Sequence, residues 1–230
     1  MMIRFTTPAL LSCVLSFAVT AADVRIGDVS LHLPPPPGYC EMDAVLASDA
    51  PLIARMHTTL TKTGNRLLAM SADCAELKEW RDGRKQALGH VAEYQTVLRF
   101  ENQTLPDTPE NVLKSYCSGM RMLGERSMPG VPLDAQERSE QASKILKPNE
   151  MIFLGVVAEE PLVCYGATLQ KVKLLSDEEN PQVAMFAAMI LKEKILLSYL
   201  FAPYADRETV TQVLAKQRTN VGQLQRANQK

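Results

Sequence analysis

Acidic side chains and one histidine gather in the segment 76–90. Glu79 and Asp82 flank Trp80, and His90 follows in the same segment. Paired carboxylates beside an aromatic ring can act as general acid and base in a carbohydrate cleft, and a histidine can transfer protons near neutral pH. A small secreted hydrolase that uses Glu79, Asp82 and His90 is therefore one hypothesis. The alternative, which we favour, is a charged turn whose tryptophan covers the edge of the core.

Metal and cofactor sites have little support in the sequence. The three histidines are far apart, and His57 and His90 do not belong to a metal-binding motif. Thioethers suit Cu(I), but methionines such as Met120 and Met185 fall on apolar faces of expected elements, where methionine usually fills the core. Phosphate-binding loops, hydrolase elbows and zinc-protease motifs are absent from the sequence. We therefore predict no catalytic residue, no metal site and no cofactor.

Residues 1–22 have the pattern of a secretory signal. Arg4 is the one charge before the apolar run 9–19, and small residues follow it, so that cleavage after Ala21 or after Ala22 fits. The run is shorter than the ~20 residues that a membrane-spanning helix needs. We expect a periplasmic or secreted protein with no stable membrane span after cleavage. The alternative is a domain held at the inner membrane by an uncleaved N-terminus.

Four of the five cysteines lie beyond the signal, and an even number in an exported chain favours two disulfides. Three pairings are possible. Cys40 follows the first expected strand and Cys74 ends the second, while Cys117 lies on a helix and Cys164 on a later strand. We favour the pairs Cys40–Cys74 and Cys117–Cys164. A zinc site would prefer the close C-x-x-C spacing that these cysteines lack.

The charge balance argues against a nucleic-acid partner. The net charge is −1 and the acidic and basic residues are interspersed, so no surface for a polyanion is indicated. A protein partner remains possible, and the oligomeric state is open. Beyond the signal, residues 23–230 are enough for one domain with a sizeable core.

The longest apolar passage beyond the signal is 183–204, which carries Lys192, Glu193 and Lys194 at its middle. As one membrane helix it would hold three charges near the bilayer centre, at a cost of about 7–10 kcal/mol. As two strands joined at a solvated turn it has ordinary strand lengths. The passage therefore predicts a buried hairpin in the middle of a sheet.

Alternation, capping residues and Gly or Pro punctuation predict the remaining elements. We expect strands at 24–33, 67–74, 88–99, 151–158 and 162–174, and helices at 48–64, 108–124, 134–144 and 206–227. The fold class is α+β, with a mainly antiparallel sheet of six to seven strands and helices on its faces. Residues 127–150 have few apolar side chains, so we expect them to form an exposed excursion from the domain.

The order of elements, the Pro36-Pro37-Gly38-Tyr39 exit from the first strand and the amphipathic C-terminal helix resemble the PsbP/DcrB-like superfamily of exported α-β-α sandwich domains. That resemblance implies an accessory or partner-binding function without a shared catalytic centre. We therefore expect an exported, non-catalytic accessory or interaction domain.

Overall fold

The computed structural model describes residues 22–131, 134–171 and 181–229. The predicted signal at 1–22 lies outside these residues except for its last position, and so do the last three residues of the strand expected at 162–174. Among the described helices, none combines the length and the apolar character that a bilayer crossing requires.

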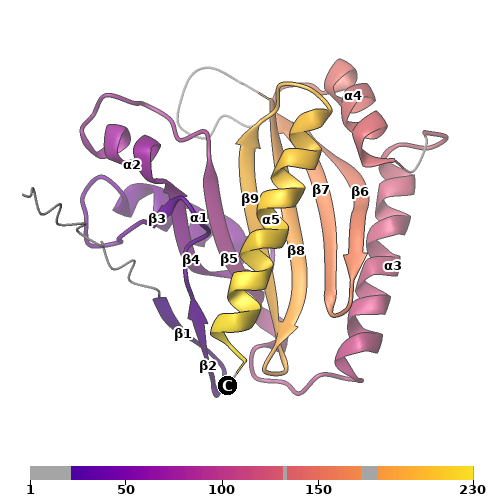
Figure 1. Cartoon of the computed structure of the whole chain (residues 1–230), viewed down its shortest axis with the longest axis horizontal. Coiled ribbons are helices and arrows are strands. Elements are labelled where there is room, and N and C mark those ends of the chain that lie inside the picture. The colour runs from indigo at the N-terminus through magenta and orange to yellow at the C-terminus, as the bar shows by residue number, and fades with distance from the viewer. Residues whose placement is uncertain (1–21, 132–133, 172–180, 230) are drawn as a thin grey trace, which may run out of the picture.

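The centre of the protein is an antiparallel sheet of seven strands in the order β3-β4-β5-β9-β8-β7-β6 (Figure 1). Its strands are β3 (Tyr39–Glu41), β4 (Asn65–Asp73), β5 (Val91–Val97), β6 (Met151–Glu160), β7 (Val163–Lys171), β8 (Pro181–Leu191) and β9 (Lys194–Pro203). The α+β class predicted from the sequence is confirmed. The long strands β8 and β9 lie in the interior of the sheet, with a strand on each side. Their side chains are apolar on both faces, as is typical of central strands whose two faces are covered.

The predicted hairpin at 183–204 is present. Leu191 pairs with Lys194 across a two-residue turn, and Lys192 and Glu193 both adopt left-handed backbone with φ of 47° and 64°. One detail differs from the prediction. Lys194 is only 8% exposed, because its amine lies 3.1 Å from Asp28 and donates to the Glu101 carbonyl at 3.1 Å. Only two of the three charges therefore form the solvated turn.

The single strand expected at 24–33 is two strands. β1 (Ala22–Ile26) and β2 (Val29–Leu33) form a separate antiparallel hairpin around Gly27, whose φ of +59° permits the tight turn. Asn228, near the C-terminus, holds this hairpin: its Oδ1 accepts from the His32 amide at 2.9 Å and its Nδ2 donates to the His32 carbonyl at 2.8 Å.

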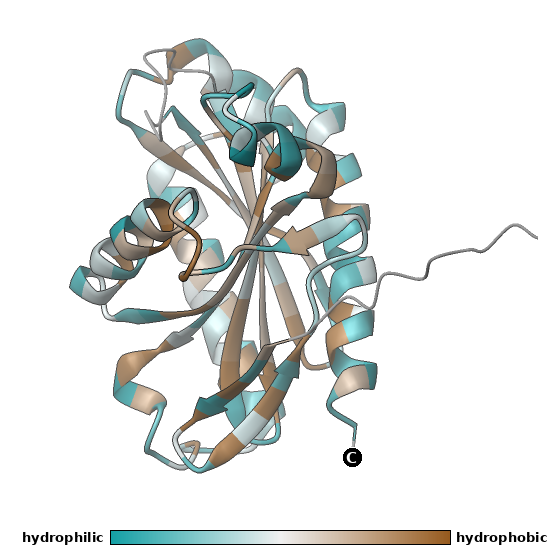
Figure 2. Ribbon diagram, turned by 90° about the vertical axis from the view of Figure 1, so that its left-hand side faces the viewer, coloured by the Kyte–Doolittle hydropathy of each residue, from teal (hydrophilic) through white to brown (hydrophobic). Residues whose placement is uncertain are grey.

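Helices cover both faces of the sheet, and Figure 2 shows the sheet on edge between them. The helices are α1 (Ala50–Lys62), α2 (Cys74–Arg81), α3 (Pro109–Ser127), α4 (Ala135–Ile145) and α5 (Glu208–Ala227), with a 3-10 turn at η1 (Leu98–Phe100). α5 crosses one face, on which Val210 and Val213 pack with Met185 and Leu200. α1 and α3 lie on the other face, where the core clusters contain Leu52 of α1 and Leu113 of α3.

A buried polar network fixes α5 to the sheet. The Gln217 amide donates to the Ser198 carbonyl at 2.7 Å, and Asn220 Nδ2 donates to Ser198 Oγ at 2.9 Å. The Tyr94 hydroxyl donates to the Pro34 carbonyl at 2.7 Å and lies 2.8 Å from Asn220 Oδ1. Such a network specifies one position of the helix along the sheet, which an apolar interface alone would not do.

Residues 127–150 were expected to be an exposed excursion, and for α4 this is wrong. Arg138 and Ser139 are buried, with exposures of 2% and 0%, and Arg138 Nη1 donates to the Leu154 carbonyl at 3.0 Å. The burial of α4 is not visible in the sequence pattern, because this helix buries small and polar side chains instead of large apolar ones. A related difference is that Gly124 does not end α3: it is buried against Gly155 and Arg138, where a side chain would have no room.

Candidate binding pocket

A cavity of about 540 Å³ lies on the face of the sheet that α1 and α3 share. Its floor is formed by β5, β9, β8 and β7, and α1 and α3 stand on opposite sides of it. The volume falls within the range of about 300–1,000 Å³ that is usual for small-molecule sites. The opposite face of these strands is covered, because α4, α5 and the β1–β2 hairpin pack their apolar side chains against it.

Aromatic rings form a continuous row across the floor. The ring centroids of Phe153 and Phe186 are 6.1 Å apart, those of Phe186 and Tyr199 are 5.5 Å apart, and those of Tyr199 and Phe201 are 6.1 Å apart. Gly166 makes this row possible, since a Cβ at this position would lie 2.2 Å from the end of the Phe186 ring. Aromatic pairs at these separations stabilise one another beyond the area that they bury.

The walls of the cavity carry apolar side chains, among them methionines from both helices, beside the polar Arg55, Thr59 and Thr63. Met56 and Leu60 come from α1, and Met120 and Leu123 come from α3. Two of the large apolar lining residues reach the surface, since Leu123 is 50% exposed and Met151 is 61% exposed. Flexible thioethers adapt to ligands of irregular shape, and exposed apolar side chains around a hollow often mark a binding site.

One carboxyl group lies at the bottom of this apolar cavity. Glu93 of β5 lines the cavity and is only 2% exposed. Gln95 Nε2 donates to Glu93 Oε2 at 2.8 Å, and Asn65 Nδ2 donates to Gln95 Oε1 at 3.1 Å. Burial raises the pKa of Glu93 to about 7, and the hydrogen bond from Gln95 opposes this rise only in part.

The neighbouring tyrosine is held neutral. Burial raises the pKa of Tyr199 above its usual range, and the nearby Tyr116 and Glu93 raise it further. Tyr199 is the residue directly opposite Glu93 on the adjacent strand. The floor thus combines one acid that can titrate near neutral pH with a phenol that stays protonated.

The residues of the hydrolase hypothesis do not form a common site. Glu79 and Asp82 are exposed on and after α2, and Asp82 pairs with Lys78 at 2.8 Å and with Arg84 at 2.7 Å. His90 Nδ1 instead lies 2.8 Å from Glu76 Oε1.

The Glu76 carboxylate is occupied by several donors. It also accepts from Lys85 at 3.1 Å and from the Gly89 amide at 2.7 Å. These hydrogen bonds outweigh the effect of burial and lower the pKa of Glu76. Such a carboxylate fixes the loop before β5. The other histidine that was considered for a site, His57, is exposed on α1.

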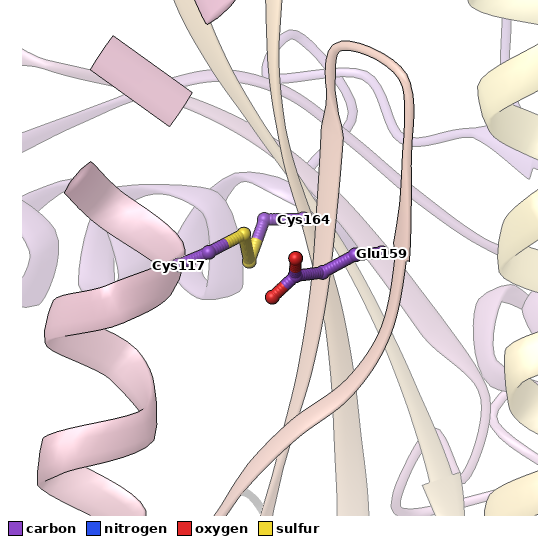
Figure 3. A group of neighbouring side chains, drawn as sticks. All are labelled: Cys117, Glu159 and Cys164. Atoms are coloured by element: carbon purple, nitrogen blue, oxygen red, sulfur yellow. A yellow bond between two sulfur atoms is a disulfide. The ribbon is translucent and has the colours of Figure 1, made fainter. Parts of the chain in front are cut away.

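The structure joins Cys40 to Cys74 and Cys117 to Cys164, the two pairs favoured from the order of elements. The second disulfide ties α3 to β7, and the Glu159 carboxylate lies beside it (Figure 3). These three residues are close enough to suggest a metal site. However, the two sulfur atoms are bonded to each other, and Glu159 pairs with Arg121. The group therefore acts as a cross-link and not as a ligand set.

Comparisons with known proteins do not show a family for this chain. No family model matches the sequence, and no curated protein matches it. Among solved structures, the chain is similar to the Ran-binding protein Mog1p of Saccharomyces cerevisiae, with 14% identity and a TM-score of 0.33 over 92% of this chain and 93% of that one. A likeness at this distance carries no argument.

Proposed function

We propose that the protein is an exported, non-catalytic accessory domain that binds a small, mainly apolar molecule in the pocket between α1 and α3. The observation that carries the proposal is the cavity of about 540 Å³, with an aromatic floor and mainly apolar lining around one buried carboxyl group. A largely apolar cavity with few convergent polar groups is the usual form of a small-molecule site.

Two features support the exported part of the proposal. The N-terminal pattern is that of a signal peptide, and two disulfides suit an oxidising compartment such as the periplasm. The PsbP/DcrB-like resemblance adds an accessory role to this proposal. The mass of the exported protein tests it: cleavage after Ala21 or Ala22 supports export, whereas a retained Met1 supports the membrane-anchored alternative.

The hydrolase alternative has weaker support. Its candidate residues Glu79 and Asp82 are exposed. His90 contacts the Glu76 carboxylate, whose two oxygens accept four hydrogen bonds. A general base needs a free lone pair directed at its substrate, which this carboxylate does not offer.

Binding of an uncharged apolar dye, N-phenyl-1-naphthylamine, tests the pocket. Ala184→Leu fills the floor and Leu123→Gln makes the rim polar, so both should weaken dye binding by about tenfold, equivalent to about 1.4 kcal/mol. Met122→Gln is the matched control, since Met122 is 51% exposed on the same helix and does not line the pocket.

Dye titrations by fluorescence, with thermal unfolding to confirm folding, separate the outcomes. Binding weakened by about tenfold in the two pocket variants and unchanged in Met122→Gln supports the proposal. Equal binding by all three variants, or no binding by the wild type, contradicts it.

A further inference from the structure

The pocket contains a buried acid for which the described residues supply no counter-charge. Two other buried charges have partners within the chain: Asp49, fully buried, lies 2.5 Å from Arg81, and Lys194 lies 3.1 Å from Asp28. Glu93 is 2% exposed and receives its hydrogen bond from the neutral Gln95. Within the described residues, no lysine, arginine or histidine forms an ion pair with it. Buried carboxylates are otherwise paired in folded proteins, because removing an unpaired charge from water is costly.

The position of Glu93 explains where its partner would come from. The side chain lines the cavity, with Met70 opposite it on β4 and Tyr199 opposite it on β9. Gln95 occupies Oε2, and in the described part of the chain no donor meets Oε1. A cationic group that enters the cavity therefore finds a carboxylate oxygen available for a charge-assisted hydrogen bond.

We propose, on the basis of the function proposed above, that the ligand carries one ammonium group and that Glu93 is its counter-ion. The apolar body of the ligand lies over the aromatic row and between the methionines of the two walls. Amphipathic monoamines, with an alkyl or aryl chain and one basic nitrogen, are the chemical class that this arrangement fits.

We expect the pH dependence of ammonium binding to come from Glu93 and not from the other polar groups that line the described pocket. Arg55 of α1 also lines the pocket. Tyr199 of β9 and Tyr116 of α3 have raised pKa values because they are buried, so both stay neutral. The remaining polar groups of the lining, such as Thr168 and Gln170 of β7, do not titrate. Any pH dependence of amine binding near neutrality therefore reports on Glu93.

A matched pair of probes tests the assignment. 4-Phenylbutylamine and 4-phenylbutan-1-ol have the same apolar body and differ in whether the end group is charged. At about pH 8, where Glu93 is ionised and the amine is still protonated, the amine should bind about tenfold or more tightly than the alcohol. At about pH 5.5 Glu93 is protonated, so this ratio should fall to within about threefold. Isothermal titration calorimetry measures both affinities.

Two variants complete the test. Glu93→Gln keeps the shape and removes the charge, so it should bind amine and alcohol equally at both pH values. Glu79→Gln removes an exposed acid outside the pocket and should keep the wild-type ratio.

The outcomes separate this inference from the proposed function. Amine binding that is no tighter than alcohol binding in the wild type, including no binding by either, overturns the assignment of an amine ligand. A ratio that survives in Glu93→Gln overturns the role of Glu93. In each case the dye titration judges the pocket itself independently, because the dye is uncharged at these pH values.

Discussion

Gln95 Nε2 donates to Glu93 Oε2 at 2.8 Å from two residues further along the same face of β5. Asn65 in turn holds the Gln95 amide, so the acid at the bottom of the pocket has a fixed orientation before any ligand arrives. A group that is already positioned loses little freedom on binding, which favours affinity.

The raised pKa of Glu93 makes the stability of the protein depend on pH. The pKa is about 7 in the folded protein and near 4.5 when the chain is unfolded. Between these values the folded state holds a proton that the unfolded state releases, so the free energy of unfolding falls as pH rises through this window. The loss is complete above the folded pKa and amounts to about 3 kcal/mol.

Glu93→Gln should remove this loss, because an amide does not ionise. We expect the variant to exceed the wild type by about 3 kcal/mol at about pH 8 and to match it within about 1 kcal/mol near pH 4.5. Urea unfolding across this range measures the difference. Parallel stability curves for the two proteins would show that the acid is not protonated in the folded state.

The contact between Gly166 and Phe186 gives a second prediction. Gly166→Ala places a methyl group 2.2 Å from Phe186 Cζ unless the ring moves, and Phe186 itself lines the pocket. We expect a loss of about 1–3 kcal/mol in the free energy of unfolding, as for an overpacked core, together with weaker binding of N-phenyl-1-naphthylamine.

Gly119→Ala on α3 is the control, because a methyl group at this position would have no atom of another element within 4 Å. This change should stabilise the helix by up to about 1 kcal/mol and leave dye binding intact. Unfolding in urea and dye titration report the two effects separately. Unchanged dye binding by Gly166→Ala would contradict the role given to this glycine.

The two disulfides should contribute similarly to stability and differently to the pocket. They close loops with sequence separations of 34 and 47 residues, for which chain entropy gives a stabilisation of about 4 kcal/mol each. Replacing Cys117 and Cys164 with serine should also weaken dye binding, because this pair holds the α3 wall to β7. Replacing Cys40 and Cys74 should lower stability alone. Equal effects of both double variants on the dye affinity would argue against α3 as a wall of the site.

The turn of the central hairpin carries avoidable strain. Glu193 has a φ of 64°, which costs a side-chain-bearing residue about 1 kcal/mol and costs glycine little. Glu193→Gly should therefore stabilise the protein by about 0.5–1 kcal/mol in thermal or urea unfolding. Lys216→Gly, in the exposed part of α5, should have the opposite effect of about 1 kcal/mol. Destabilisation by both changes would show that the turn is not strained.

Regular patterns in the sequence predicted much of the fold. Apolar runs on both faces predicted β8 and β9 as central strands, and Thr108 with Pro109 marked the start of α3. The same approach failed where small residues pack closely. A glycine after an apolar helical stripe indicates a helix end, and Gly124 fits that pattern. The real reason for this glycine is its close contact with Gly155, which is far away in the sequence and therefore not visible in a local pattern.

The pocket could not be predicted from the sequence. Glu93 falls within the strand expected at 88–99, but this strand also carries Gln95 and Thr96, and polar side chains of a strand often face water. The cavity over this face of β5 depends on how α1 and α3 are placed on the sheet, with a space left between them. That placement is a tertiary feature, which a local sequence pattern does not contain. In contrast, Glu79, Asp82 and His90 are close in sequence, but their contacts differ: Asp82 pairs with Lys78 and Arg84, and His90 contacts Glu76.

The two walls of the pocket are attached unequally. α3 has a covalent link to β7, whereas neither disulfide involves α1, whose one buried residue in the described helix is Leu52. The disulfide limits how far α3 can move from the floor, so we expect any widening of the pocket to come mainly from α1. Substitutions that let the pocket accept longer or bulkier ligands would accordingly lie mainly on α1.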